Sequence, residues 1–261
     1  MGTFETLRLE RDGKIATLWF NRPDRLNAFD QKMRDELPRA WGEIAEDREI
    51  WAVILTGTGD RAFCAGMDLK EPPPKVDEGG ALPRVRITAL DCGVMKPVIA
   101  AVNGVCAGGG LAFVADSDIV LCSEDATFTD GRTSAGQVSI HGTLRLARKI
   151  PLEAVFRLVM LGRAEKMSAK RAHEIGMVSE IVPKGDLMSR ARALAQTIAE
   201  NSPNAIFHTK RTILRSLDMG LDRAREEGWE TVTRFARESA DPIEGGRAFT
   251  EKRKPVWKLQ S

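Results

Sequence analysis

The stretch that decides the fold is KPVIAAVNGVCAGGGLAFVADSDIVLC, residues 96–122. Its apolar run at residues 98–102 lies between a proline and an Asn-Gly pair, a pattern that predicts a short buried β-strand. Three consecutive glycines, residues 108–110, lead into an apolar segment at 111–115, where we expect a helix. A further apolar run at 119–121 predicts another strand.

The glycine turn itself suggests a function. Glycines between a buried strand and a helix start let another molecule approach the backbone closely. The first N–H groups of a helix lack intrahelical partners, and the helix dipole favours negative charge beside them. Such a turn suits a bound anion or an oxygen that becomes negative during a reaction; a bare tight turn is the competing interpretation. The fingerprints G-x-G-x-x-G and G-x-x-x-x-G-K-[ST] are absent, which disfavours nucleotide binding of those two kinds.

Composition excludes several classes of protein. The chain has 261 residues, of which 43% are hydrophobic and 29% charged, as expected for a globular protein with one core and a small appended unit. It contains no apolar run of the roughly 18 residues that span a bilayer and no signal-peptide pattern. A net charge of +2 favours neither nucleic acid nor membrane partners. The four cysteines form no C-x-x-C pair, so we expect no metal site, no disulfides and a cytoplasmic location.

Strand and helix patterns alternate through most of the chain. Two apolar runs around Asp12-Gly13 predict a hairpin, and Asp30 is placed to cap the helix that follows. A buried strand is expected over 51–56, a helix after Asp68 and another helix over 84–92. This alternation predicts an α/β fold with parallel strand pairing.

Two further segments complete the predicted organisation. Residues 72–83, PPPKVDEGGALP, are rich in proline and glycine, which predicts a loop that could cover a site. Only helical patterns occur over 187–252. We therefore divide the chain into a core at 1–200 and a helical C-terminal region at 201–261.

A second glycine turn points to a known family. The segment FCAGMD, residues 63–68, is again a small-residue turn after a buried strand, and two N–H groups from two such turns would form an oxyanion hole. With NRPDRLNAF, residues 21–29, and AFTEKRK, residues 248–254, the chain resembles the crotonase (enoyl-CoA hydratase/isomerase) superfamily. The four motifs occur in the family's order and cover nearly the whole chain.

This resemblance implies a spiral of ββα units with a helical C-terminal trimerisation region, in a homotrimer or a dimer of trimers. The implied substrate is an acyl-coenzyme A thioester, with coenzyme A as part of the substrate and no separate cofactor. The amides of Met67 and Gly109 would hold the thioester oxygen, each lowering the barrier by ~3–4 kcal/mol as enolate charge develops. The family's coenzyme A contacts fall on Arg25, Leu26, Ala28, Ala62, Cys64, Ala65, Lys70, Phe249 and Lys252.

The chain departs from the family at the two catalytic glutamates of enoyl-CoA hydratases. The resemblance places these positions at Ala112 and Arg132. Hydration needs a base for water and an acid for the α-carbon, and neither alanine nor arginine serves. We therefore do not expect the ordinary hydratase reaction, whereas coenzyme A binding and enolate stabilisation are unaffected.

The remaining acid–base candidates lie in one segment, residues 130–142. His141 could exchange a proton near neutral pH, or simply bond to backbone at a helix start. Asp130 is either a general base or the ion-pair partner of Arg132, which lies on the same side of an extended segment. Otherwise Arg132 could clamp a substrate carboxylate. Ser139 is a weaker candidate for orienting a water molecule.

Three functions follow as hypotheses. The first is an acyl-CoA enzyme of hydratase/isomerase type with a non-standard acid–base set. The second is a hydrolase of the same fold that cleaves a carbon–carbon bond or a thioester with His141 and Asp130. The third is a non-catalytic acyl-CoA-binding or RNA-binding homologue, which is disfavoured for RNA because short basic runs on helices are usually solvated faces.

Overall fold

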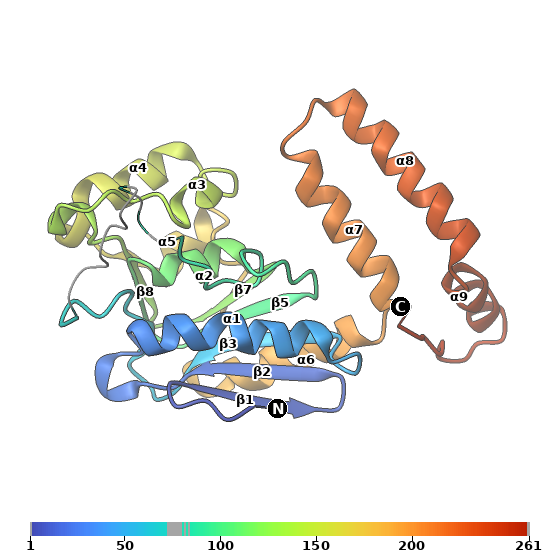
Figure 1. Ribbon diagram of the computed structural model, residues 1–261, viewed down its shortest axis with the longest axis horizontal. Coiled ribbons are helices and arrows are strands. Elements are labelled where there is room, and N and C mark those ends of the chain that lie inside the picture. The colour runs from blue at the N-terminus through green and yellow to red at the C-terminus, as the bar shows by residue number, and fades with distance from the viewer. Residues whose placement is uncertain (1, 72–79, 81, 83, 260–261) are drawn as a thin grey trace.

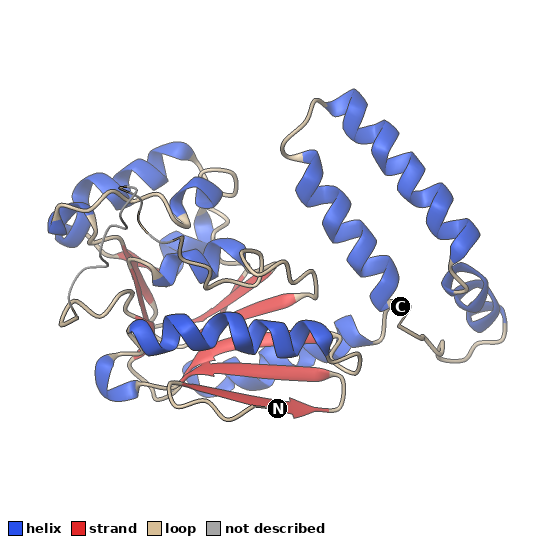
Figure 2. Ribbon diagram, viewed as in Figure 1, coloured by secondary structure: helices blue, strands red, loops and turns tan. Residues whose placement is uncertain are grey.

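The computed structural model describes residues 2–71, 80, 82 and 84–259, so most of the loop predicted at 72–83 lies outside the described residues. A six-stranded sheet forms the centre of the molecule (Figure 2). Its strands, in spatial order, are β1 (Leu7–Asp12), β2 (Ile15–Phe20), β3 (Ala52–Gly57), β5 (Val98–Val102), β7 (Ile119–Ser123) and β10 (Glu180–Val182). β1 and β2 form the predicted antiparallel hairpin, and the remaining pairs are parallel.

A second sheet is continuous with the first. Three strands of the six-stranded sheet each lead through a turn into a short strand of this second sheet. Its order is β4 (Ala62–Cys64), β6 (Val105–Ala107), β8 (Thr127–Thr129) and β9 (Met167–Ser168). β3 leads into β4, β5 into β6 and β7 into β8, and α2 (Gly110–Asp116) follows β6. This repeat of two strands and a helix confirms the predicted α/β spiral.

Helices cover both faces of the large sheet, which explains why its inner strands read as continuous apolar runs. Val53 and Leu55 of β3 pack into the larger core cluster with α1 (Gln31–Glu46) and α2. The alternate residues Ala52 and Ile54 pack against α6 (Leu187–Ala199). Figure 1 shows α1 crossing in front of the sheet and α6 behind it. Successive side chains of a strand therefore point alternately into two separate cores, one on each face of the sheet.

Short helices gather over the second sheet and complete the core region (Figure 1). They are α3 (Thr143–Leu146), α4 (Leu152–Leu161) and α5 (Ala169–Glu174), with 3₁₀ turns at Pro23–Arg25, Thr133–Ala135, Gly162–Ala164 and Lys184–Asp186. The predicted cap at Asp30 is confirmed, since its carboxylate accepts from the Met33 amide. At the start of α5 the Ser168 hydroxyl accepts from the Arg171 amide in the same way.

The C-terminal helices form an arm that leaves the core. They are α7 (Pro203–Ser216), α8 (Leu221–Glu238) and α9 (Asp241–Thr250), and Figure 1 shows them extending away from the sheets. Lys210 of α7 ties the arm to the core through an ion pair of 2.7 Å with Asp118. No residue of α8 is buried. The division at residue 200 stays a prediction. No helix in the described part of the chain combines the length and apolar content needed to cross a bilayer.

One predicted helix is not seen, and most of another lies outside the described residues. The helix over 84–92 is wrong, because Thr88 and Asp91 cap each other: the Thr88 hydroxyl accepts from the Asp91 amide, and the Asp91 carboxylate accepts from the Thr88 amide. Gly93, at φ +76°, then ends the segment after a single turn. Beyond Asp68 the chain forms a turn as far as Glu71, where the described segment ends.

Candidate active site

The two glycine turns lie directly against each other. A Cβ atom added to Gly66 would stand 2.8 Å from the carbonyl oxygen of Ala107 and 3.0 Å from the amide nitrogen of Gly109. A Cβ atom on Gly110 would likewise collide with the carbonyl oxygen of Cys64. Only glycine fits at these positions, because each turn packs backbone against backbone of the other.

Two amides at this contact have no partner within the described part of the chain. The N–H groups of Met67 and Gly109 donate to no group among the described residues. Three nearby amides are engaged: Ala65 donates to the Leu26 carbonyl at 3.0 Å, Asp68 to the Phe29 carbonyl at 3.0 Å, and Gly108 to the Thr129 carbonyl at 2.9 Å. Backbone N–H groups are rarely left without partners. These two are available to an acceptor that does not belong to the chain.

Phe29 holds the two turns in place from one side. Its amide donates to the Gly66 carbonyl at 2.8 Å, so it is tied to the first turn. Its ring lies where a Cβ atom on Gly109 would be, 2.5 Å from the ring carbon Cζ, so it also covers the second turn. The ring packs edge-on against Phe113, with 6.4 Å between centroids. Core packing therefore fixes the separation of the two free amides.

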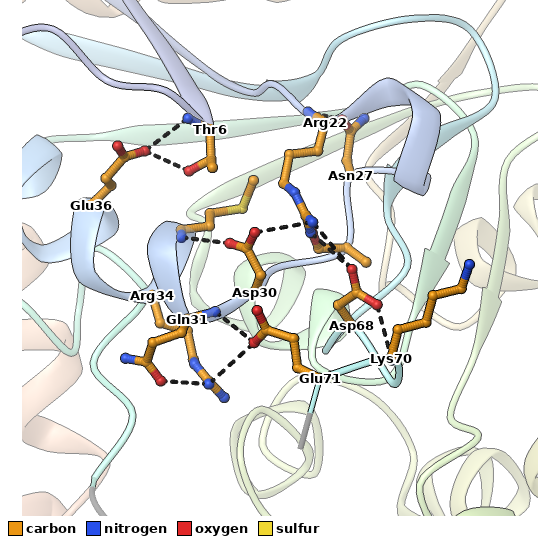
Figure 3. A network of polar contacts seen from close by, with 12 residues as sticks. Thr6, Arg22, Asn27, Asp30, Gln31, Arg34, Glu36, Asp68, Lys70 and Glu71 are labelled. Carbon is orange, nitrogen blue, oxygen red and sulfur yellow. Dashed lines mark hydrogen bonds and ion pairs between the residues drawn. The ribbon is translucent and has the colours of Figure 1, made fainter. Parts of the chain in front are cut away.

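Arg22 connects three segments around the first turn (Figure 3). Its guanidinium lies 3.0 Å from the Asp30 carboxylate and 3.2 Å from the Asp68 carboxylate. It also donates to the Ala28 carbonyl. Burial raises the pKa of Asp68, but hydrogen bonds from the Lys70 amide and Arg22, with the charges of Arg22 and Arg25, lower it overall. Arg22 therefore fixes Asp68, the residue next to Met67, against the N-terminus of α1.

The sequence analysis did not single out Arg22 or Asn27, although both belong to the motif at residues 21–29. The Asn27 side chain is fully buried; it accepts from the Arg22 amide at 3.0 Å and donates to the carbonyls of Thr58 and Ala62. Arginine and asparagine are common on surfaces. Their burial therefore gives no signal in a single sequence, except through the motif itself.

The residues matched to coenzyme A contacts divide into two groups. Those of the first group lie around the first turn, where Ala28, Ala62 and Cys64 are buried, Arg25 and Lys70 are exposed, and the Ala65 amide donates to Leu26. The second group, Phe249 and Lys252, lies at the end of the arm, away from this turn in Figure 1. A single chain therefore does not bring the two groups together.

Burial raises the pKa of the Cys64 thiol to about 12, which makes it a poor nucleophile at neutral pH.

Asp130 and Arg132 form the expected ion pair. The Asp130 side chain is fully buried, and its two oxygens accept from Arg132 Nε at 2.8 Å and Nη2 at 2.7 Å. Ser139 donates to the same carboxylate at 2.6 Å, and Arg132 Nη1 donates to the His141 carbonyl at 2.8 Å. Burial raises the pKa of Asp130, but these hydrogen bonds and the Arg132 charge lower it overall. The group braces the loop, and a carboxylate so engaged is a weak base.

His141 lies beside the first turn of α2. The neighbouring Gly142 packs on buried Ala112, since a Cβ atom on this glycine would stand 2.6 Å from the Ala112 Cα. The His141 Nε2 atom is 2.9 Å from a carboxylate oxygen of Asp91, and its side chain is 37% exposed. Asp91 was not among the predicted site residues, because it lay inside a predicted helix.

The Arg22 network generates a prediction on stability. We expect Arg22→Gln to lower the free energy of unfolding by about 2–3 kcal/mol at pH 7, because two half-buried carboxylates lose their partner. The pKa of Asp68 lies below its ordinary value of 3.8 in the folded chain. The contribution of ionised Asp68 to stability is therefore complete above pH 3.8, and it is lost as the pH falls through the lower pKa of Asp68 in the folded chain.

Urea unfolding of both proteins between pH 3 and pH 7 checks this. The difference between them should be constant near neutrality and shrink toward acid. Arg190→Gln, which removes an exposed ion pair with Glu180, is the matched control and should cost less than about 1 kcal/mol. Equal effects of the two substitutions would show that Arg22 does not hold the turn.

Known proteins match this chain over nearly its whole length. A family model described as enoyl-CoA hydratase/isomerase matches residues 10–260. The carnitinyl-CoA dehydratase of Salmonella enteritidis PT4 is 35% identical over 97% of this chain and 98% of its own length.

Solved structures agree with this match. An enoyl-CoA hydratase/isomerase from Mycobacterium paratuberculosis superposes with a TM-score of 0.90 at 39% identity, over 99% of this chain and 100% of that one. An enoyl-CoA hydratase from Mycobacterium tuberculosis H37Rv gives a TM-score of 0.85 at 31% identity, over 97% and 98% of the two chains. The chain therefore belongs to the enoyl-CoA hydratase/isomerase family of the crotonase superfamily.

Proposed function

We propose that this chain is an acyl-CoA thioester enzyme that stabilises a thioester enolate between the amides of Met67 and Gly109. The observation that carries the proposal is a pair of N–H groups, on two turns in backbone contact, that donate to none of the residues that the structure describes. Removal of an α-proton from a thioester moves the C–H electron pair toward the carbonyl oxygen. Two fixed donors aimed at that oxygen stabilise the charge as it develops, each by ~3–4 kcal/mol.

The residues around the first turn suit the binding of coenzyme A. In this proposal coenzyme A is part of the substrate, and no separate cofactor takes part. Arg25 and Lys70 are exposed cations close to Asp68 and are suitable for binding phosphate groups. Leu26 and Ala65 join the two segments through their backbone at 3.0 Å. Phe249 and Lys252 would complete this site from the arm of a neighbouring copy.

The acid–base set differs from that of a hydratase. Ala112 and Arg132 stand at the positions of the two family glutamates, and Arg132 is engaged with Asp130. With Asp130 held ionised and its oxygens occupied, His141 is the group that remains for proton transfer. The proposed chemistry is therefore removal and return of an α-proton, as in a double-bond shift, rather than addition of water.

A hydrolase is the second candidate, favoured by one observation. A histidine paired with a carboxylate, as His141 is with Asp91, can activate water for attack on a thioester or a ketone. The same assays separate the two functions, because hydrolysis of a thioester releases a free thiol and a double-bond shift does not.

The substrate assays give the first prediction on activity. We expect a shift of the double bond in 3-hexenoyl-CoA, and exchange of the α-protons of butyryl-CoA with deuterated water. Crotonyl-CoA should be hydrated weakly, because the groups that activate water are replaced. A kcat/KM for hydration above ~10⁶ M⁻¹s⁻¹ would contradict this assignment. Release of coenzyme A as the fastest reaction would favour the hydrolase.

Gly109→Ala tests the amide pair directly. The new methyl group would collide with the Phe29 ring, so either the ring or the Gly109 amide has to move. We expect the rate of α-proton exchange to fall about 100-fold, with partial recovery in Gly109→Ala/Phe29→Leu, which provides space. Gly185→Ala, where nothing lies within 4 Å, is the control and should retain full activity. An unchanged rate in the single variant would remove Gly109 from the site.

We further propose a homotrimer or a dimer of trimers, built through the arm. An apolar groove of about 580 Å³ runs between α7 and α8. Ile213, Trp229 and Val232 line it and are 58%, 71% and 53% exposed, respectively. Exposed apolar patches of this kind mark interfaces between proteins.

Sedimentation should give the mass of three or six copies, and Trp229→Glu should yield smaller species. Arg223→Glu, on the same helix and 76% exposed, should leave the assembly intact. A monomer at micromolar concentration would contradict the proposal.

A further inference from the structure

A second polar network lies beside the proposed site and is not explained by it. It joins the single turn at 88–93 to α2 and α3 through four charged side chains and one hydroxyl. The Arg145 guanidinium contacts Asp116 and lies 3.7 Å from Asp91 Oδ1. The Thr88 hydroxyl donates to Asp116, and His141 Nε2 lies 2.9 Å from Asp91 Oδ2.

Asp91 is fixed within this network. Its carboxylate accepts from the amides of Ile87 at 3.4 Å and Thr88 at 3.3 Å, besides His141. Its side chain is only 15% exposed. Burial raises the pKa of Asp91, but the hydrogen bonds from His141 and Thr88 and the charge of His141 lower it to about 2. Asp91 is therefore ionised at neutral pH and can only accept hydrogen bonds.

The Asp91 oxygen beside Nε2 determines which nitrogen of the His141 ring carries the hydrogen. Because the Asp91 carboxylate cannot donate, the hydrogen must be on His141 Nε2, and in the neutral ring Nδ1 then holds the lone pair. Nδ1 has no hydrogen-bond partner among the described residues. The protein thus holds one nitrogen of His141 and leaves the other free to exchange a proton.

The network also fixes the backbone beside the histidine. Gly142 rests on Ala112, and the Ala112 amide donates to the Gly109 carbonyl at 3.1 Å, so Gly142, the residue after His141, packs one helical turn from the proposed oxyanion hole. Arg145, one turn further along the chain, pairs with Asp116, one turn further along α2. These contacts pin α3 beside α2, so the position of the imidazole does not depend on a free loop.

We propose that Asp91 is the positioning residue of His141, which serves as the acid–base group of this site through Nδ1. The inference rests on the proposed function. In the forward step Nδ1 takes the α-proton, the C–H electron pair forms the enolate, and its charge lies on the oxygen held by Met67 and Gly109. The imidazolium, paired with the Asp91 carboxylate, then returns a proton to the α- or γ-carbon. No oxidant or further reactant is required.

Several charged groups surround the histidine. The Asp91 carboxylate lies beside its ring, and Arg145 and Asp116 lie further along the same network. Arg132 contacts His141 only at its backbone carbonyl, and the Arg132 charge is balanced by the Asp130 carboxylate. On the turn at 84–93, Arg86 donates to the Asp91 carbonyl, and burial raises the pKa of the half-buried Cys92 thiol, which is therefore neutral near pH 7.

Asp91→Asn tests the proposal, because asparagine keeps the size of the side chain and removes its charge. We expect kcat for α-proton exchange of butyryl-CoA to fall about 10–100-fold, with KM changed less than twofold. The acid limb of the pH–kcat profile should move to lower pH, because the imidazolium loses its anion. His141→Ala should lower kcat at least ~100-fold, and the double variant should be no slower than His141→Ala alone.

Asp125→Asn is the matched control, since it breaks an ion pair with Lys184 elsewhere on the surface. It should leave kcat and its pH profile unchanged. An unchanged profile in Asp91→Asn, or effects of the two site substitutions that simply multiply, would overturn the proposal.

A second measurement does not depend on activity. ¹⁵N NMR of the histidine side chains should show His141 of the native chain protonated at Nε2 and not at Nδ1 above neutral pH, and a mixture of tautomers in Asp91→Asn. A native ring protonated at Nδ1 would overturn the pairing. If the native chain leaves every thioester unchanged, the proposed function fails, and with it the catalytic role of His141. The tautomer then still decides whether Asp91 orients the ring.

Discussion

The contact between two glycine turns is the constraint on which the site depends. The turn after β4 and the turn after β6 meet without side chains between them, so their backbones pack directly on each other. Parallel pairing of β4 with β6 brings the two turns to the same sheet edge. The ring of Phe29 then closes the contact from the core side. A pair of donors held this way needs no reorganisation when negative charge develops beside it.

Around this rigid pair, polar side chains fix the segments that secondary structure leaves free. Arg22 ties the first turn to α1, and Arg132 ties the loop before α3 to Asp130. Arg145 ties α3 to α2. Arg22 and Arg145 each join a carboxylate from another segment, whereas Arg132 joins Asp130 to the His141 carbonyl within one loop. The planar guanidinium restrains the backbone on both sides. The loops therefore have defined positions without belonging to either sheet.

Much of the fold was predictable, because β3, β5 and β7 are buried on both faces and so leave continuous apolar runs in the sequence. The hairpin at β1 and β2 and the cap at Asp30 were also predicted, since turn and cap chemistry act locally. The helix over 84–92 was wrong because the cap between Thr88 and Asp91 and the stop at Gly93 limit the segment to a single turn. The pairing of Asp91 with His141 joins residues fifty positions apart, and nothing in a single sequence encodes it.

The brace between Asp130 and Arg132 has a consequence for how the site could change during evolution. A glutamate at position 132 would leave the fully buried Asp130 without its cation, at a cost of several kcal/mol of folding free energy. A larger side chain at position 112 would have to pass the Gly142 backbone that lies on Ala112. A carboxylate at position 112 or at position 132 therefore cannot be introduced by a single substitution without moving the loop. Such a change would require several coordinated substitutions.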